Sequence, residues 1–205
     1  MKKITYILIA IFLTNCTSKS INILNSNTLI KKSFNKSEIK DLQKIFDFFN
    51  NEICNSNYGK LNECYQNYCS KKKKQVEQNV ELEFSTNINF EKQQKLYSKI
   101  QNNTFKEIWS FQKSLPIRER KDTLKHLSFN HNGKFVKFIK QYGNENKKIK
   151  DYYESFLIFR DISPAMFAGI LMEFEDYDIK DIRTKLIFAI HYLTFNDQNL
   201  REEKY

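Results

Sequence analysis

Apolar residues recur at spacings of three and four along most of this chain, and this pattern constrains the fold more than any other feature of the sequence. Such spacing places the side chains on one face of an α-helix. In residues 37–54 the stripe follows Ser37, an expected N-cap with acidic residues just after it. Its members are Ile39, Leu42, Ile45, Phe46, Phe49 and Ile53.

The same pattern predicts a helical fold over most of the remaining chain. Ser163 followed by Pro164 is a strong helix start, and Gly143 stands where a left-handed C-terminal residue is expected. We expect an all-α class, a compact irregular helical bundle or helix-hairpin array of about six to eight helices. Beyond residues 37–54, the predicted helical stretches are 60–69, 90–100, 103–115, 130–143, 147–159, 161–174 and 177–195.

Residues 163–168 are the least charged part of the chain beyond its N-terminal segment. Because a helix that is apolar all round is normally enclosed by other elements, we expect the helix that they begin to be central and buried. Its apolar side chains are Met166, Phe167, Ile170, Leu171 and Met172.

Two neighbouring stretches break the helical pattern. Four lysines occupy residues 71–74 and predict a solvated surface stretch. Val80, Leu82 and Phe84 then alternate with polar residues, which is a weak strand signal. We expect an extended loop here, or at most a minor β element near 78–86.

The first residues have the pattern of an export signal. Lys2 and Lys3 precede a mostly apolar run of ten residues, Ile4–Leu13, which is too short to cross a bilayer and has the length of a signal-peptide core. The run ends in Leu13, Thr14, Asn15, Cys16, and here the chain resembles the bacterial lipoproteins, although Asn15 stands where they usually carry Gly, Ala or Ser.

The lipoprotein resemblance covers only residues 1–16 and implies that Cys16 becomes the acylated first residue of the mature protein. Two or more acyl chains anchor a protein firmly, whereas one binds reversibly. Thr17, rather than Asp, follows the cysteine, which by resemblance points to the outer membrane of the cell envelope. The alternative is an ordinary signal peptide, cut near residue 17 or 20.

These signals divide the chain into three parts. Residues 1–15 are the expected lipoprotein signal peptide, residues 16–36 the lipidated N-terminus and tether, and residues 37–205 a single helical domain. The tether is polar and rich in Ser and Asn. Its few apolar residues could instead pack on the domain; these are Ile23, Leu24, Leu29 and Ile30.

The basic charge of the chain is a poor indicator of its partners. The formal net charge is +10, with 29 Lys against 5 Arg and 22 Asn against 4 Ala. Lysine, asparagine, isoleucine and phenylalanine are the residues of AT-rich codons, so the lysine excess reflects genomic bias. Since an envelope location also removes access to cytoplasmic nucleic acid, we expect no nucleic-acid partner.

Three cysteines remain beyond Cys16, in a compartment where disulfides persist. Cys64 and Cys69 would lie about 140° apart on a helix and could not meet. We therefore expect Cys54 to pair with Cys64, leaving Cys69 undecided; the alternative is three free thiols. No His or CxxC lies nearby, so no metal site is expected.

Few side chains point to catalysis. His126 and His131 are five residues apart, which fits neither one helix face nor a metal motif, and we expect surface or capping roles. His191 lies on an apolar helix face and is expected to be a core histidine bonded to a neighbour. None of the common nucleophile, zinc-protease or phosphate-loop motifs occurs, and no cofactor is predicted.

These observations favour a non-catalytic module that binds an envelope protein or a small ligand at the membrane surface. Such a module should expose an apolar patch rimmed by polar residues. One alternative is an envelope-located hydrolytic enzyme that uses His126 or His131 with acidic residues, and it should show a cleft with converging titratable groups. A second is an immunity or defence protein with a strongly charged face.

Overall fold

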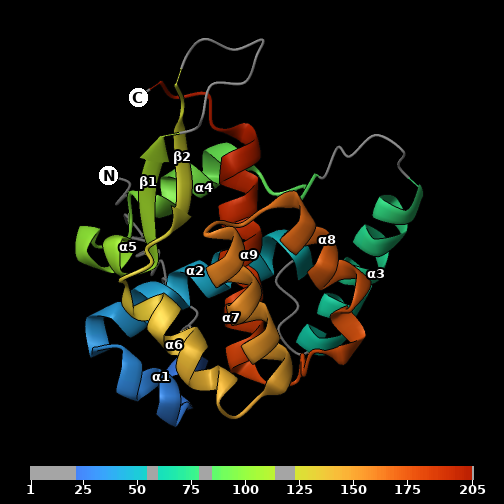
Figure 1. The fold of residues 1–205 in the computed structure, drawn as a ribbon. Coiled ribbons are helices and arrows are strands. Elements are labelled where there is room, and N and C mark those ends of the chain that lie inside the picture. Colours follow the sequence, from blue (N-terminus) through green and yellow to red (C-terminus); the bar gives the residue numbers. More distant parts are fainter. Residues whose placement is uncertain (1–21, 55–59, 79–84, 114–122, 205) are drawn as a thin grey trace, which may run out of the picture.

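The computed structural model describes residues 22–54, 60–78, 85–113 and 123–204. The predicted all-α class with a minor β element is confirmed: these residues contain nine α-helices and one two-stranded sheet (Figure 1). The elements are η1 (Ile23–Ser26), α1 (Thr28–Ser33), α2 (Lys36–Cys54), α3 (Leu61–Gln78), α4 (Phe90–Tyr97), α5 (Asn102–Ile108), β1 (Trp109–Lys113), β2 (Lys125–Phe129), α6 (Lys134–Gly143), α7 (Lys147–Phe159), α8 (Pro164–Met172), η3 (Phe174–Asp176) and α9 (Ile182–Leu200).

Helix α9 is the centre of the fold. It runs through the middle of the molecule and contacts α2, α4, α8 and β2 (Figure 1). Every residue from 184 to 197 is buried, so no face of its middle part meets solvent. Its own side chains supply much of the aromatic core; Phe188, Tyr192 and Phe195 each contact other buried rings.

The expectation that α8 is the central helix is wrong. Met166, Phe167, Ile170 and Leu171 are buried, but Met172 is 44% exposed, and the opposite face of the helix is open. The buried face of α8 packs on α3 and α9. Overall apolarity did not identify the core helix, because α9 buries its polar side chains by pairing them with partners on other elements.

The sheet lies away from the predicted position. Strands β1 and β2 pair antiparallel, with Trp109 opposite Phe129 and Lys113 opposite Lys125. The predicted helix over 103–115 therefore ends at Ile108. Trp109 is buried and its indole donates to Thr194, a contact distant in sequence that local spacing could not reveal. Residues 79–84, the middle of the predicted β element, lie outside the described residues.

The described part of the predicted tether packs on the helical domain. Leu24 and Ile30 are fully buried, and the Leu24 amide donates to Gln43 of α2 at 3.2 Å. Helix α1 lies against α6 and α2. Over residues 22–34 the chain therefore follows the alternative in which its apolar side chains join the core.

Local signals set several helix ends. Ser163 caps α8 and Pro164 is its first residue, as expected. Helix α2 begins one residue earlier than predicted, because Asn35 and Glu38 cap it by reciprocal bonds between side chain and backbone. Gly143 is not left-handed. It lies within α6, where an added Cβ would come within 3.0 Å of the Lys150 Cα.

Candidate functional site

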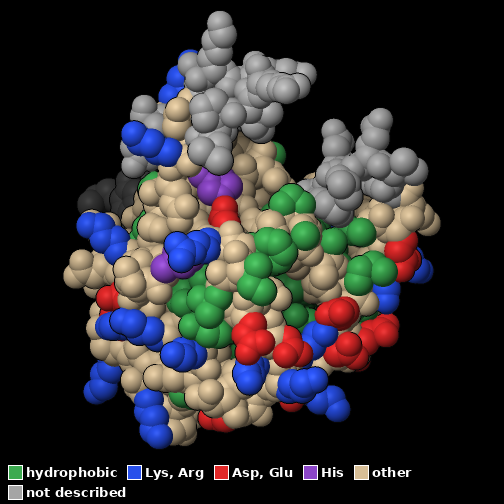
Figure 2. Space-filling view, in the orientation of Figure 1, with side chains coloured by type: hydrophobic (Ala, Val, Ile, Leu, Met, Phe, Trp, Pro, Cys, Tyr) green, Lys and Arg blue, Asp and Glu red, His purple; other side chains and the backbone are tan. Residues whose placement is uncertain are grey.

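An open apolar surface extends from the end of α7 along the outer face of α8. We call it the α7–α8 surface and define it by Leu157, Ile158, Phe159, Ala165 and Met172. Ile158 is 78% exposed and Phe159 is 52% exposed. Figure 2 shows apolar side chains gathered over α7 and α8, with acidic side chains clustered beside them. Exposed apolar side chains concentrated in this way are typical of a binding surface.

A groove of about 220 Å³ runs between α7 and α8 within this surface. Phe159, Met166 and Ile170 line it, and Gly169 leaves one wall without a side chain. No atom lies within 4 Å of the position that a Gly169 Cβ would occupy. The groove can therefore admit an apolar side chain of a partner.

The rim of the groove is acidic. Lys148 pairs with Glu173 at 2.5 Å and with Asp176 at 3.7 Å, so one cation meets two carboxylates. Asp151 also lines the groove, and among the described residues no cation lies within ion-pair distance of it. The excess of negative charge suits a partner that carries Lys or Arg beside its apolar side chains.

The floor of the groove connects to the core through Tyr152. The Tyr152 hydroxyl is 3.0 Å from His191 Nδ1, which confirms His191 as a buried histidine bonded to a neighbour. His191 Nε2 is buried without a hydrogen-bond partner. Burial lowers the pKa of His191 to about 3, so the ring is neutral at physiological pH.

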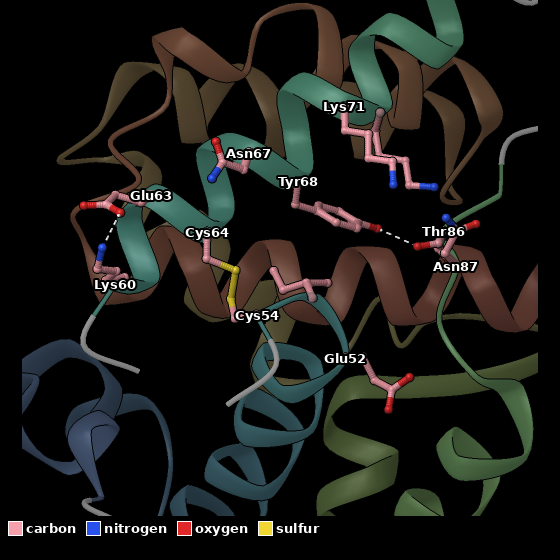
Figure 3. A pocket seen from close by; sticks show the side chains of 12 residues that line it. Glu52, Cys54, Lys60, Glu63, Cys64, Asn67, Tyr68, Lys71, Thr86 and Asn87 are labelled. Atoms are coloured by element: carbon pink, nitrogen blue, oxygen red, sulfur yellow. Dashed lines mark hydrogen bonds and ion pairs between the residues drawn. A yellow bond between two sulfur atoms is a disulfide. The ribbon is translucent and has the colours of Figure 1, made fainter. Parts of the chain in front are cut away.

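A second cavity, of about 430 Å³, lies beside the Cys54–Cys64 disulfide. The disulfide joins the end of α2 to α3 with a Cα–Cα distance of 5.5 Å, and it is the pair favoured from the sequence. Figure 3 shows α3 side chains, Tyr68 and Lys71 among them, facing Thr86. The Tyr68 hydroxyl donates to the Thr86 carbonyl at 3.0 Å. We call this cavity the α3 pocket.

The lysine run at 71–74 is not a uniformly solvated stretch. It belongs to α3, which continues to Gln78, and Lys72 is only 3% exposed. Lysine, glutamine and glutamate are good helix formers, so the helix does not break here. Sequence reasoning missed Lys72 as a pocket residue. Its position, four residues after Tyr68 and three after the buried Cys69, could have indicated that it lies on the same helix face as these residues.

The two remaining histidines lie near each other in sequence but make separate contacts. His126 Nε2 bonds to the Asp161 carboxylate, and the hydrogen bond raises the pKa of His126 although burial opposes it. Gln198 donates to the same carboxylate at 3.0 Å. His131 Nε2 lies 2.9 Å from the Arg160 carbonyl and its ring stacks on Phe156.

The His126–Asp161 pair could move a proton, but catalysis needs a further group. Within the part of the chain that the structure describes, no hydroxyl or thiol bonds to either side chain. The described residues also contain no group of three side chains arranged to hold a metal. The pair connects β2 to the residues between α7 and α8, so its role is structural.

The remaining cysteines, Cys16 and Cys69, do not add to either cavity as the structure describes it. Cys16 lies outside the described residues. Cys69 is a buried free thiol, and burial raises its pKa to about 12. None of the helices in the described ranges is both long and apolar enough to span a bilayer.

Comparison of the chain with models of protein families, with curated proteins and with solved structures finds no match.

Proposed function

We propose that this protein is a bacterial envelope lipoprotein, anchored through acylated Cys16 in the outer membrane, whose helical domain is a non-catalytic binding module. The anchor rests on the N-terminal pattern of a basic start, a short apolar run and a cysteine. The domain would then meet its partner at the membrane surface, and it needs no transmembrane helix of its own to stay there.

The observation that carries the binding function is the groove between α7 and α8. It combines exposed apolar side chains, an open wall at Gly169 and an acidic rim that includes Asp151. The partner that fits is a protein segment with apolar side chains for the groove and basic residues for the rim. A small ligand would leave most of the surrounding apolar surface uncovered.

Catalysis is the weaker alternative. The described residues contain one histidine–carboxylate pair, His126 with Asp161, and no hydroxyl, thiol or metal-binding group of those residues joins it. Loss of all biological activity in His126→Gln, with the fold and partner binding intact, would favour the hydrolytic enzyme.

The anchor is tested by the intact mass of the protein from membranes of its own host, with Cys16→Ala beside it. We expect a species heavier than residues 16–205 by a diacylglycerol and an acyl chain. The mutant should lose both the added mass and the membrane association. An unmodified product cut at another residue would overturn the lipoprotein proposal.

The groove is tested by a photoreactive amino acid at Ala165, an exposed residue that lines it. We expect one defined crosslinked partner in the host envelope. Asp151→Lys should abolish the crosslink, because it places a cation opposite the basic residues of the partner. Glu154→Lys is the matched control, an exposed site on the same helix that does not line the groove.

An unchanged crosslink in Asp151→Lys would show that the acidic rim does not select the partner. Equal loss in both variants would mean that general charge, and not the groove, sets the interaction. Either result contradicts the proposed partner chemistry.

A further inference from the structure

The α3 pocket contains a buried lysine that is not paired with any acidic side chain of the described residues. Lys72 Nζ donates to the backbone carbonyl of Ser85, and its ammonium lies 5.9 Å from the Tyr68 ring centre. Among the described residues, no carboxylate lies within ion-pair distance of Lys72. A buried charge is normally retained only with a partner, and within the described ranges this amine has no anion to compensate it.

Lys71 adds a second cation to the same pocket. It lines the cavity (Figure 3). It is the chain neighbour of Lys72 and its side chain is exposed. Burial first, and then the charge of Lys71, lower the pKa of Lys72 to about 8. An anion placed between the two ammonium groups would relieve their repulsion and favour the charged form of Lys72.

The acidic residues of the pocket are already engaged. Glu52 pairs with Lys92 at 3.2 Å and accepts from the Asn89 amide. Glu63 pairs with Lys60 at 3.5 Å. Neither carboxylate pairs with Lys71 or Lys72, so the described side chains at this end of the pocket leave a positive charge for a ligand.

The size and lining of the pocket set the class of ligand. A cavity of about 430 Å³ is in the range of small-molecule sites and is far larger than a bare anion needs. Asn67, Asn87 and the backbone around Thr86 line the remainder. These groups suit a body with hydroxyl groups. The Cys54–Cys64 disulfide forms part of the wall and fixes the end of α2 against α3.

We propose that the α3 pocket binds a small organic oxyanion, a phosphate monoester or carboxylate with a hydroxylated body, whose anionic group lies between Lys71 and Lys72. Lysine is a common phosphate ligand and acts there as a point charge. This site is separate from the α7–α8 groove, so its test does not depend on the partner-protein proposal.

The test is a calorimetric titration of the full chain, purified in uncharged detergent micelles, with glycerol phosphate and with glycerate. These probes share a hydroxylated body and differ in the anionic group, so the tighter one identifies the class. We expect saturable binding by at least one. Lys72→Met should weaken it by about tenfold to a hundredfold, the effect of one charge-assisted hydrogen bond. Lys74→Met, an exposed lysine on the same helix, is the matched control.

Lys71→Gln gives a second variant at an exposed site, where folding is not at risk, and it should also weaken binding. The proposal is overturned if neither probe binds saturably, or if Lys71→Gln and Lys74→Met behave alike. Binding to phosphatidylglycerol vesicles without any response to the free probes would also overturn it, since the lysines would then contact lipid headgroups.

Discussion

Helices α8 and α9 reverse the relation between apolar sequence and burial. Helix α8 carries no charged residue, yet its outer face is open and Met172 is 44% exposed. Helix α9 carries Lys185, His191 and Asp197, yet it is buried on every side from residue 184 to 197. Polar side chains of a helix can be buried when other elements supply hydrogen-bond partners for them. An apolar helix with one face exposed to solvent is a candidate binding surface.

Several polar residues of α9 are buried together with hydrogen-bond partners that other elements supply. Thr194 accepts from the Trp109 indole at 2.7 Å, and Tyr142 bonds to Thr184 at 3.0 Å. Asp197 accepts from Gln94 of α4 at 3.0 Å and, at the end of α9 itself, forms two bonds of 2.7 Å with the Arg201 guanidinium. The outer face of α8 has no such partners, since its side chains offer no hydrogen bonds.

The largest expected effect comes from Asp197→Ala. The carboxylate is fully buried and accepts from Arg201 and Gln94. Its removal leaves Gln94 without this acceptor, and it leaves a guanidinium only 8% exposed with the half-exposed Glu203 as its remaining ion-pair partner among the described residues. We expect a loss of about 3–5 kcal/mol in the free energy of unfolding, measured by chemical denaturation. Glu154→Ala is the control. Its exposed pair with Lys150 contributes at most about 1 kcal/mol. Equal losses in the two variants would contradict the buried pairing.

The next largest effect is acid destabilisation through His191. Its pKa is about 3 in the folded state and about 6.5 in the unfolded chain, so the unfolded state binds the proton first as the pH falls. Stability is therefore lost progressively from pH 6.5 down to pH 3, by about 3 kcal/mol between pH 7 and pH 4.

The measurement is the NMR titration of the three histidine rings between pH 8 and pH 4. The His191 signal should stay unchanged until the protein unfolds. His126 should titrate above its ordinary value, because its bond to Asp161 raises its pKa. A His191 ring that titrates near pH 6 in the folded protein would show that it is not enclosed in the core.

The smallest expected effect concerns the exposed face of α8. Gly169→Ala should stabilise the protein by about 0.5–1 kcal/mol, because the added methyl meets no atom within 4 Å and alanine is the better helix former. Gly143→Ala should destabilise it, since the same methyl would approach the Lys150 Cα at 3.0 Å. Thermal denaturation of both variants measures the difference. Destabilisation by Gly169→Ala would indicate that another element covers α8.

Local rules predicted what depends on local interactions. The apolar stripe of residues 37–54, the Ser163–Pro164 start and the pairing of Cys54 with Cys64 could all be read from spacing and short loops. The hairpin of β1 and β2 could not, because it depends on Trp109 reaching a helix 85 residues away. The burial of α9 on every side could not either, since Thr184 and Thr194 look exposed until their distant partners Tyr142 and Trp109 are known.

The candidate sites were predicted less well than the fold. The α7–α8 groove needs two helices placed side by side, and residue 163 onward was expected to be core. Lys72 was hidden in a run of four lysines that resembles a solvated stretch. Lys72 differs from its neighbours in the run because it lies on the same face of α3 as Tyr68 and Cys69. This could be inferred only if the helix was expected to continue through the lysine run.

The central position of α9 also has a consequence for how the chain acquires its structure. Its closest helical partner early in the chain is α2, and more than a hundred residues separate the two. Contacts so distant in sequence slow folding, because the entropy of closing a long loop is lost before they form. The core around α2 and α4 is therefore incomplete until α9 has been made and has packed against them.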